Sequence, residues 1–233
     1  SLHDALPIYF LFKKGAPLFK GTAAYAEWQA AVQYFGTQRS SKIQIIDLQK
    51  ISAPKFLAPK KIAIHAHIFY ADLAPELAQL LIHFPAPFDL LISIPKSNDE
   101  KLIRTQFKGI ANLQNLQILI TPNQGRDLGP MLYGFGKQLL NYDYFAHVHT
   151  KKSSGTNDIG NAWRKYLIQG LFDSTQDRTL KILGLLEEYG LVYPQKFPLI
   201  DVQNCQWGDN LKAANALCES MQIPTPSSGY IEF

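Results

Sequence analysis

Apolar runs alternate with segments of helical periodicity along most of this chain. Runs rich in Ile, Leu, Val and Phe are typical of buried strands, and they cover residues 62–69, 88–94, 116–120, 142–146 and 190–194. Apolar residues at helical spacing occupy 72–84, 97–108, 127–141, 163–171, 174–189 and 207–221. Because strands alternate with helices of about 10 to 15 residues, the pattern predicts an α/β fold, with a mostly parallel sheet and helices on both faces.

Weaker signals precede residue 61. Residues 23–35 have an amphipathic helical pattern, 43–46 a short strand pattern, and 52–61 the proline- and lysine-rich composition of a linker. We place a domain boundary near Pro59, so that residues 1–60 form an N-terminal extension or linker and 61–233 the main domain. Further along the chain, Asp72 is a candidate N-cap for the helix that contains Pro75, and 155–160 are expected to form a flexible loop.

The two ends of the sequence suggest an incomplete chain. Residues 1–8 resemble translated sequencing adaptor, and the sequence stops at Phe233 within a strand-like run. We therefore expect a fragment at both ends, with residues 1–8 non-native and the main domain truncated at its C-terminus.

Composition and charge exclude several classes of function. Charged residues make up 18% of the chain, the net charge is +4, and no block of five like charges occurs, so we expect no nucleic-acid partner. The positive excess suits a small anionic ligand. The cysteines, Cys205 and Cys218, lack zinc-binding or disulfide-framework spacing, which favours a reducing, cytoplasmic location. No apolar run reaches the roughly 18 residues of a membrane-spanning helix.

A first polar block, residues 123–130, follows the strand at 116–120. Open α/β sheets bind ligands outside the carboxyl ends of their strands, so this block is placed to contact one. Gly125 permits a tight turn, Arg126 offers a fork that matches phosphate or carboxylate, and Asp127 either caps the next helix or holds a sugar hydroxyl. A capped loop with a surface arginine is the simpler alternative. The block matches neither the Walker loop nor the dinucleotide fingerprint.

A second polar block, residues 147–153, follows the next strand. His147 and His149 alternate along the strand and therefore point to the same side. Lys151 and Lys152 follow the strand end, where they are placed to neutralise a diphosphate. A core histidine and a solvated lysine pair are the alternative explanation.

Further candidates lie outside these blocks. His65 and His67 form a second H-x-H pair, so a zinc-like site is one hypothesis, although no carboxylate is adjacent in sequence to either pair. One of the histidines, or Asp127, is instead a candidate general base. Arg164 is placed to reach an anionic ligand from the helix after the lysine pair.

Several motifs between residues 61 and 233 occur together in a known family. They are Ile64 to Tyr70, Phe88-Asp89-Leu90, Ile92-Ser93, Asn123 with Gly125-Arg126-Asp127, Gly129-Pro130, Tyr142-Asp143-Tyr144, His149-Thr150-Lys151-Lys152-Ser153, Trp163-Arg164, and Gly190-Leu191-Val192 with Pro194. This set resembles the rhamnan synthesis F family. Its members act in the synthesis of rhamnose-containing bacterial cell-surface polysaccharides and are regarded as rhamnosyltransferases.

The resemblance implies a GT-A-like nucleotide-sugar domain. In that fold the strand corresponding to 144–149 usually ends in an Asp-x-Asp metal motif, and here His147-Val148-His149-Thr150-Lys151 stands in its place. This departure puts metal dependence in doubt, so no metal ligand and no cofactor is assigned. Our hypothesis is that Arg126, Lys151 and Lys152 stabilise the leaving diphosphate instead.

The expected function is therefore a glycosyltransferase that moves a deoxyhexose, L-rhamnose from dTDP-L-rhamnose, onto a growing cell-surface polysaccharide. The expected partners are the nucleotide-sugar donor and a glycan or lipid-linked glycan acceptor, and peripheral association with the inner-membrane assembly machinery stays open. Asp127 and His149 are the catalytic candidates. The substrate-binding candidates are Asn123, Gly125, Arg126, Thr150, Lys151, Lys152, Arg164 and His67. A metal-dependent hydrolase that uses the two H-x-H pairs, and a non-catalytic sugar-nucleotide-binding module, are the alternatives.

Overall fold

The computed structural model describes residues 10–13, 44–55, 58–150, 152, 157–173, 177–199, 207, 210–222 and 225. The chain divides into two compact units, and the larger one consists of Pro7–Lys14 and Asp47–Pro194. The described part of the other unit includes helix α8 (Asn210–Met221), which confirms most of the helix expected at 207–221. The helix expected at 23–35 lies outside the described residues.

The larger unit is built on a six-stranded sheet with the order β4-β3-β2-β5-β1-β6. The strands are β1 (Phe10–Lys13), β2 (Ile62–His67), β3 (Phe88–Ile94), β4 (Leu113–Ile120), β5 (Tyr144–His149) and β6 (Leu191–Val192). Strands β4, β3, β2 and β5 are parallel, whereas β1 runs antiparallel to β5 and to β6. The prediction of a mostly parallel α/β sheet is confirmed.

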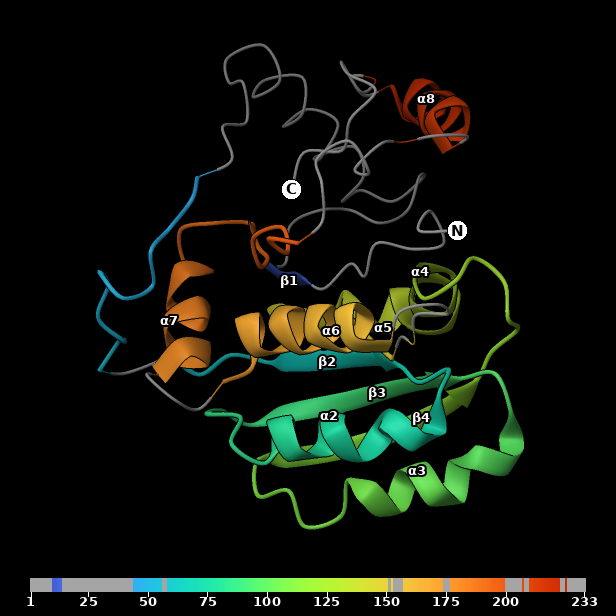
Figure 1. Cartoon of the computed structure of the whole chain (residues 1–233), viewed down its shortest axis with the longest axis horizontal. Coiled ribbons are helices and arrows are strands. Elements are labelled where there is room, and N and C mark those ends of the chain that lie inside the picture. Colours follow the sequence, from blue (N-terminus) through green and yellow to red (C-terminus); the bar gives the residue numbers. More distant parts are fainter. Residues whose placement is uncertain are drawn as a thin grey trace. The chain divides into compact units, whose positions relative to one another are not determined.

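Helices cover both faces of this sheet (Figure 1). They are α2 (Ala74–Leu81), α3 (Glu100–Gln106), α4 (Leu128–Pro130), α5 (Gly136–Leu139), α6 (Asn157–Leu171) and α7 (Arg178–Leu185). Short 3-10 turns, η1 (Ala71–Leu73) and η2 (Ser97–Asp99), precede α2 and α3, and a π-helical turn, η3 (Met131–Phe135), joins α4 to α5. Helices α2, α3 and α6 lie on one face, and α4 and α5 lie on the other (Figure 1).

The connections reverse direction at β2. From β2 the chain passes to β3 and then to β4 on one side, and it returns to β5 on the other side of β2. The helices of these two excursions therefore cover opposite faces. Such a reversal is the switch point at which open α/β sheets bind their ligands. We call the carboxyl ends of β2 and β5, His67 and His149, together with Thr150, the switch-point edge.

Burial explains the strand sequences. Every residue of β2 and β5 is buried, as expected for central parallel strands covered on both faces, whereas β4 at the sheet edge is only partly covered. On the α4–α5 face, a core cluster lies directly behind the site residues. It contains Ala63, Leu91, Met131, Phe135, Leu139 and Phe145.

Three local predictions differ from the structure, and one strand was missed. Residues 44–46 have no regular structure, and Ile45 is 77% exposed, because no strand of the described chain pairs with them. The loop expected at 155–160 gives way to α6 from Asn157 onward, so Gly160 lies within a helix. Asp72 is not an N-cap, because it lies inside η1, and the residues before η1 and α2 are Tyr70 and Leu73; its carboxylate binds Lys152 instead. Strand β1 was not predicted.

Candidate functional site

Four buried histidines lie side by side near the switch-point edge. His65 pairs in register with His147, and His67 with His149, on the neighbouring parallel strands β2 and β5. Because these positions alternate along each strand, all four side chains point to the α4–α5 face. Their exposed fractions are only 0%, 4%, 0% and 7% for His65, His67, His147 and His149. We call this group the histidine array.

Hydrogen bonds connect three of the four histidines, together with Asp127 and Ser93, into a continuous hydrogen-bond chain. His147 Nε2 lies 2.8 Å from Asp127 Oδ2, and His147 Nδ1 lies 2.8 Å from His65 Nδ1. On the far side, His65 Nε2 is 3.1 Å from the hydroxyl of Ser93, which is 2.8 Å from His67 Nδ1. The chain therefore runs from Asp127 through His147, His65 and Ser93 to His67. His149 stacks beside His147, with 6.2 Å between the ring centroids.

Burial and the neighbouring rings disfavour the charged forms of His65 and His67. Burial lowers the pKa of His65 well below 6.5, and the neighbouring His147, His67 and His149 lower it further. Burial also lowers the pKa of His67 to about 4, although the carboxylate of Asp127 acts in the opposite direction. Burial opposes ionisation of Asp127, but the hydrogen bond from His147 and the electrostatic influence of the nearby His149 and His147 outweigh it and lower the pKa of Asp127 to about 2. Asp127 is thus the anionic end of the chain.

A tight turn delivers Asp127 to His147 from the loop after β4. Gly125 and Arg126 both have positive φ, 70° and 54°, and the amide of Gly129 donates to the carbonyl of Gly125 at 2.7 Å. A Cβ at Gly129 would lie 2.2 Å from the carbonyl oxygen of Gln124, so only glycine fits there. Asn123, Gly125 and Arg126 are exposed around this turn, whereas Asp127 is buried. The predicted role of Gly125 in a tight turn is confirmed.

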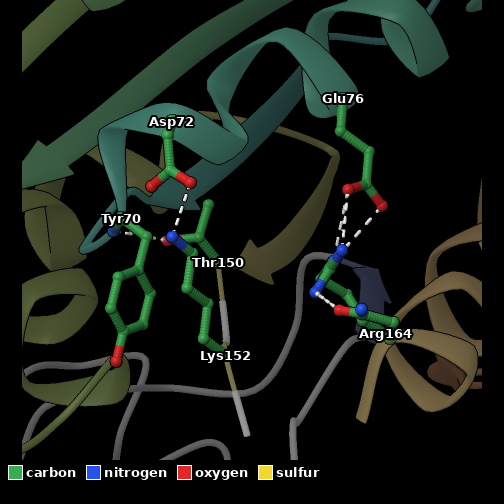
Figure 2. A network of polar contacts seen from close by, with 7 residues as sticks. Tyr70, Asp72, Glu76, Thr150, Lys152 and Arg164 are labelled. Atoms are coloured by element: carbon green, nitrogen blue, oxygen red, sulfur yellow. Dashed lines mark hydrogen bonds and ion pairs between the residues drawn. The ribbon is translucent and has the colours of Figure 1, made fainter. Parts of the chain in front are cut away.

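The segments that follow β2 and β5 are bound to each other by polar contacts (Figure 2). The amide of Thr150 donates to the carbonyl of His67 at 3.0 Å, and the amide of Tyr70 donates to the hydroxyl of Thr150 at 3.0 Å. Lys152 binds the carboxylate of Asp72, and its ammonium lies 5.1 Å from the ring centroid of Tyr70. Lys152 thus forms an exposed ion pair close to the residues that follow the switch-point edge.

A second ion pair lies beside the first (Figure 2). The guanidinium of Arg164 on α6 donates to both carboxylate oxygens of Glu76 on α2, at 3.0 to 3.3 Å, and to the side chain of Asn161. Arg164 is 8% exposed. Its observed partner is therefore a protein carboxylate that joins two helices, and its proposed contact with a ligand remains a prediction.

The structure brings together some of the predicted site residues. Asp127, His67, His149 and Thr150 lie at or next to the switch-point edge. The first polar block follows β4 as expected, but the strand expected at 142–146 is β5 (Tyr144–His149), so the second block begins inside this strand and only its part from Thr150 onward follows it. Lys151 lies outside the described residues, so its approach to Arg126 stays a prediction. Sequence reasoning missed the partners Ser93, Asp72 and Glu76. No sequence signal identifies them, because each pairing depends on which residues of separate elements become neighbours.

The metal hypothesis meets a geometric difficulty. Two nitrogens that share a tetrahedral zinc ion at about 2.0 to 2.1 Å must stand roughly 3.3 Å apart, and the facing Nδ1 atoms of His65 and His147 are 2.8 Å apart, as in a hydrogen bond. Within the part of the chain that the structure describes, no group of three or more His, Cys, Asp or Glu side chains is arranged to hold a metal ion.

These features define the class of protein: an α/β domain whose polar side chains converge at the switch point of a parallel sheet. The chain belongs to the Rhamnan synthesis protein F family, whose family model matches residues 35–227. This confirms the resemblance seen in the sequence motifs. No curated protein and no solved structure shows a significant match to the chain. Among the described helices, none combines the length and apolar character needed to cross a membrane.

Proposed function

We propose that this protein is a glycosyltransferase that moves L-rhamnose from dTDP-L-rhamnose onto a growing cell-surface polysaccharide. Membership of the Rhamnan synthesis protein F family supports a role in rhamnan synthesis. The observation that carries the proposal is the convergence of Asp127, His67 and Thr150, from three separate segments, at the switch-point edge. That edge is where parallel α/β sheets bind nucleotide-containing ligands.

The charges at this edge suit a diphosphate. Lys152 forms an exposed ion pair with Asp72, and Arg126 lies exposed on the turn before Asp127. In the proposal, these cations and Lys151 bind the donor diphosphate and stabilise the negative charge that develops as it leaves. The GT-A-like character of the domain is part of the same proposal, and so is a mechanism in which protein cations take the place of a divalent metal.

The remaining candidates complete the site. Asp127 and His149 are proposed to act in catalysis, and Asn123, Gly125 and Thr150 to contact the donor. The acceptor is proposed to be a glycan or lipid-linked glycan, bound during peripheral association with the inner face of the plasma membrane.

A calorimetric titration with dTDP tests the donor site. We expect saturable 1:1 binding that weakens about tenfold in Lys152→Met, because one favourable charge contact of roughly 1.4 kcal/mol is lost. Asp72→Asn should bind dTDP at least as tightly as the wild type, because the competing carboxylate is neutralised. Lys165→Met is the matched control, because it removes an exposed lysine from the same region of the chain without touching the edge.

Two results would contradict the proposal. One is the absence of dTDP binding, and the other is an equal loss of affinity in Lys152→Met and Lys165→Met. The titration should be unchanged in excess chelator. Binding that disappears in chelator and returns with manganese would assign the neutralising charge to a metal ion instead of the lysines.

A further inference from the structure

The hydrogen bonds of the histidine array have a consistent direction. Asp127 is ionised and only accepts, so His147 donates to it through Nε2–H and, as a neutral ring, accepts at Nδ1. His65 must then donate through Nδ1–H, which leaves its Nε2 to accept from the hydroxyl of Ser93. The hydroxyl oxygen in turn accepts from Nδ1–H of His67. All four donors therefore point toward Asp127.

The opposite arrangement requires an additional buried charge. If His147 donated to His65, it would carry protons on both nitrogens and be an imidazolium, with His65 and His149 beside it. Such a ring would form a buried ion pair with the Asp127 carboxylate, and desolvating a second charge at a site where His147 is 0% exposed costs more than burying a neutral, hydrogen-bonded ring. The neutral arrangement, with its single negative charge on Asp127, is therefore the resting state that we assign.

The hydrogen-bond chain ends on a basic nitrogen, Nε2 of His67, at the switch-point edge. In the neutral arrangement His67 carries its proton on Nδ1, so Nε2 has a lone pair. His67 is the last residue of β2, and its Nε2 makes no hydrogen bond within the described part of the chain. The other end, Asp127, can accept a proton on its carboxylate.

We propose that His67, Ser93, His65, His147 and Asp127 form a proton relay, in which His67 Nε2 takes a proton from the acceptor hydroxyl and the relay passes one proton on to Asp127. This inference rests on the proposed function for the identity of the reacting groups. It makes His67 the catalytic base that touches substrate, whereas Ser93, His65 and His147 act through it as positioning and relay residues.

The step balances as follows in the proposed transfer. The acceptor O–H bond breaks, its electron pair forms the bond to the anomeric carbon, and the bond from that carbon to the diphosphate breaks with its pair leaving on the phosphate oxygen. The proton binds His67 Nε2. His67 Nδ1–H then passes its proton to Ser93, Ser93 to His65 Nε2, His65 Nδ1–H to His147 Nδ1, and His147 Nε2–H to Asp127. Each ring stays neutral and changes tautomer, and only the carboxylate is neutralised.

The relay also explains why these polar groups are buried in series. A hydrophobic core of the same volume would be at least as stable, since buried polar groups gain little net stability even when they are fully hydrogen-bonded. If these histidines only had to be buried, each could make its own hydrogen bond without being connected to the others. A relay, in contrast, needs every link, because one missing donor or acceptor stops proton transfer.

The resting arrangement is tested by NMR of the ¹⁵N-histidine-labelled full chain, without any ligand. At pH 7 we expect His65 and His67 as Nδ1–H tautomers and His147 as the Nε2–H tautomer, all neutral. An imidazolium signal for His147, or an Nε2–H tautomer for His65, would overturn the proposed direction. This measurement does not depend on the protein being a glycosyltransferase.

The function of the relay is tested by release of rhamnose from dTDP-L-rhamnose with water as the acceptor. Ser93→Ala should reduce kcat by about 10²-fold or more with little change in KM, because general base catalysis typically contributes 10² to 10⁴. Ser93→Thr retains the hydroxyl and should recover most of the rate. Asp127→Asn keeps an acceptor for His147 but cannot take the proton, so its rate should fall like that of Ser93→Ala.

The results separate the two proposals. If dTDP binds and rhamnose is released, but Ser93→Ala and Asp127→Asn match the wild type, the relay is wrong and the transferase proposal stands. If dTDP does not bind, the transferase proposal fails. The histidine tautomers measured by NMR then still show whether the hydrogen-bond chain has the assigned direction. A variant that loses the wild-type histidine signals has lost the array, and the comparison then rests on Ser93→Thr and Asp127→Asn.

Discussion

The turn that carries Asp127 needs glycine at two positions for two different reasons. At Gly125 the backbone is left-handed, and a side chain there would also meet Gly129 Cα at 2.8 Å. At Gly129 the obstacle is contact alone, because an added Cβ would overlap the carbonyl of Gln124. The spacing of glycines in the first polar block is thus a packing requirement of the turn.

We predict that Gly129→Ala weakens dTDP binding by at least tenfold, because relief of the overlap moves Asp127 and the exposed Arg126. Gly125→Ala should lower the free energy of unfolding by at least about 1 to 2 kcal/mol, because the left-handed backbone costs that much and the contact with Gly129 Cα adds to it. Gly190→Ala is the control, because a Cβ there meets nothing within 4 Å, and its stability should stay within about 0.5 kcal/mol of wild type. Thermal unfolding and dTDP titration of the three variants measure these effects. Wild-type affinity in Gly129→Ala would show that the turn tolerates the side chain.

Individual residue roles could be predicted from sequence only where the reason is local. The turn at Gly125 follows from backbone freedom, and the position of Asp127 at the helix entrance follows from its neighbours along the chain. The contact of Asp127 with His147 does not, because it depends on a loop crossing from β4 to a strand 20 residues later. Ser93 belongs to one of the family motifs, but its contacts with the histidines could not be predicted, since they arise from the register that sets β3 beside β2.

At the scale of elements, α2 and α6 are joined by the ion pair between Glu76 and Arg164. The Arg164 side chain is 9% exposed and that of Glu76 is 31% exposed, and the guanidinium contacts both carboxylate oxygens. Removing one member of a buried pair leaves the other without compensation, which costs about 3 to 5 kcal/mol at full burial. Partial exposure of Glu76 reduces that cost here.

A double-mutant cycle with Arg164→Met and Glu76→Gln measures this pair. We predict a coupling energy of about 1.5 kcal/mol or more from urea unfolding, with dTDP affinity changed little in either single variant. The pair Arg104 and Glu100 on α3 is the matched control: its side chains are 43% and 41% exposed, so we expect a coupling of about 0.5 kcal/mol or less. Equal coupling in the two cycles would mean that burial does not strengthen the first pair. A large loss of dTDP affinity in Arg164→Met would instead support the predicted contact of Arg164 with the ligand.

The elements themselves were predictable where the pattern was strong. The strand at 88–94 has the predicted bounds, and the strand predicted at 62–69 is β2, which is two residues shorter. Both could be located because periodicity and flanking prolines define such segments locally. Strand β1 has four residues and pairs with β5 more than 130 positions away, so no local sequence pattern predicts it. The helix predicted at 127–141 is present, but its π-helical turn, η3, was not predicted.

At the scale of the whole molecule, the histidine array couples folding to pH. The folded pKa of His67 is about 4, below the ordinary 6.5, so between these values the unfolded chain binds a proton that the folded chain does not. Stability is therefore complete above pH 6.5 and decreases as the pH falls toward 4, by on the order of 3 kcal/mol for His67. His65 acts in the same direction. Asp127 adds a further loss as the pH falls from 3.8 to about 2.

We predict that the free energy of unfolding, measured in urea from pH 7.5 to 4, falls less steeply in His67→Asn than in the wild type. The variant retains a side-chain amide donor toward Ser93 but cannot be protonated. His83→Asn, at an exposed position outside the array, is the control and should reproduce the wild-type slope. Identical slopes for all three proteins would show that His67 titrates as it does in the unfolded chain.

The antiparallel strand β1 has a practical consequence for anyone who shortens this protein. Phe10–Lys13 lies between β5 and β6, so it hydrogen-bonds one side of the strand that carries His147 and His149. A version trimmed to the strongest sequence pattern, starting at residue 61, would leave that side of β5 open to pairing with another molecule. Loss of activity or precipitation in such a version would then reflect a missing neighbour strand, and would say nothing about the chemistry of the histidines.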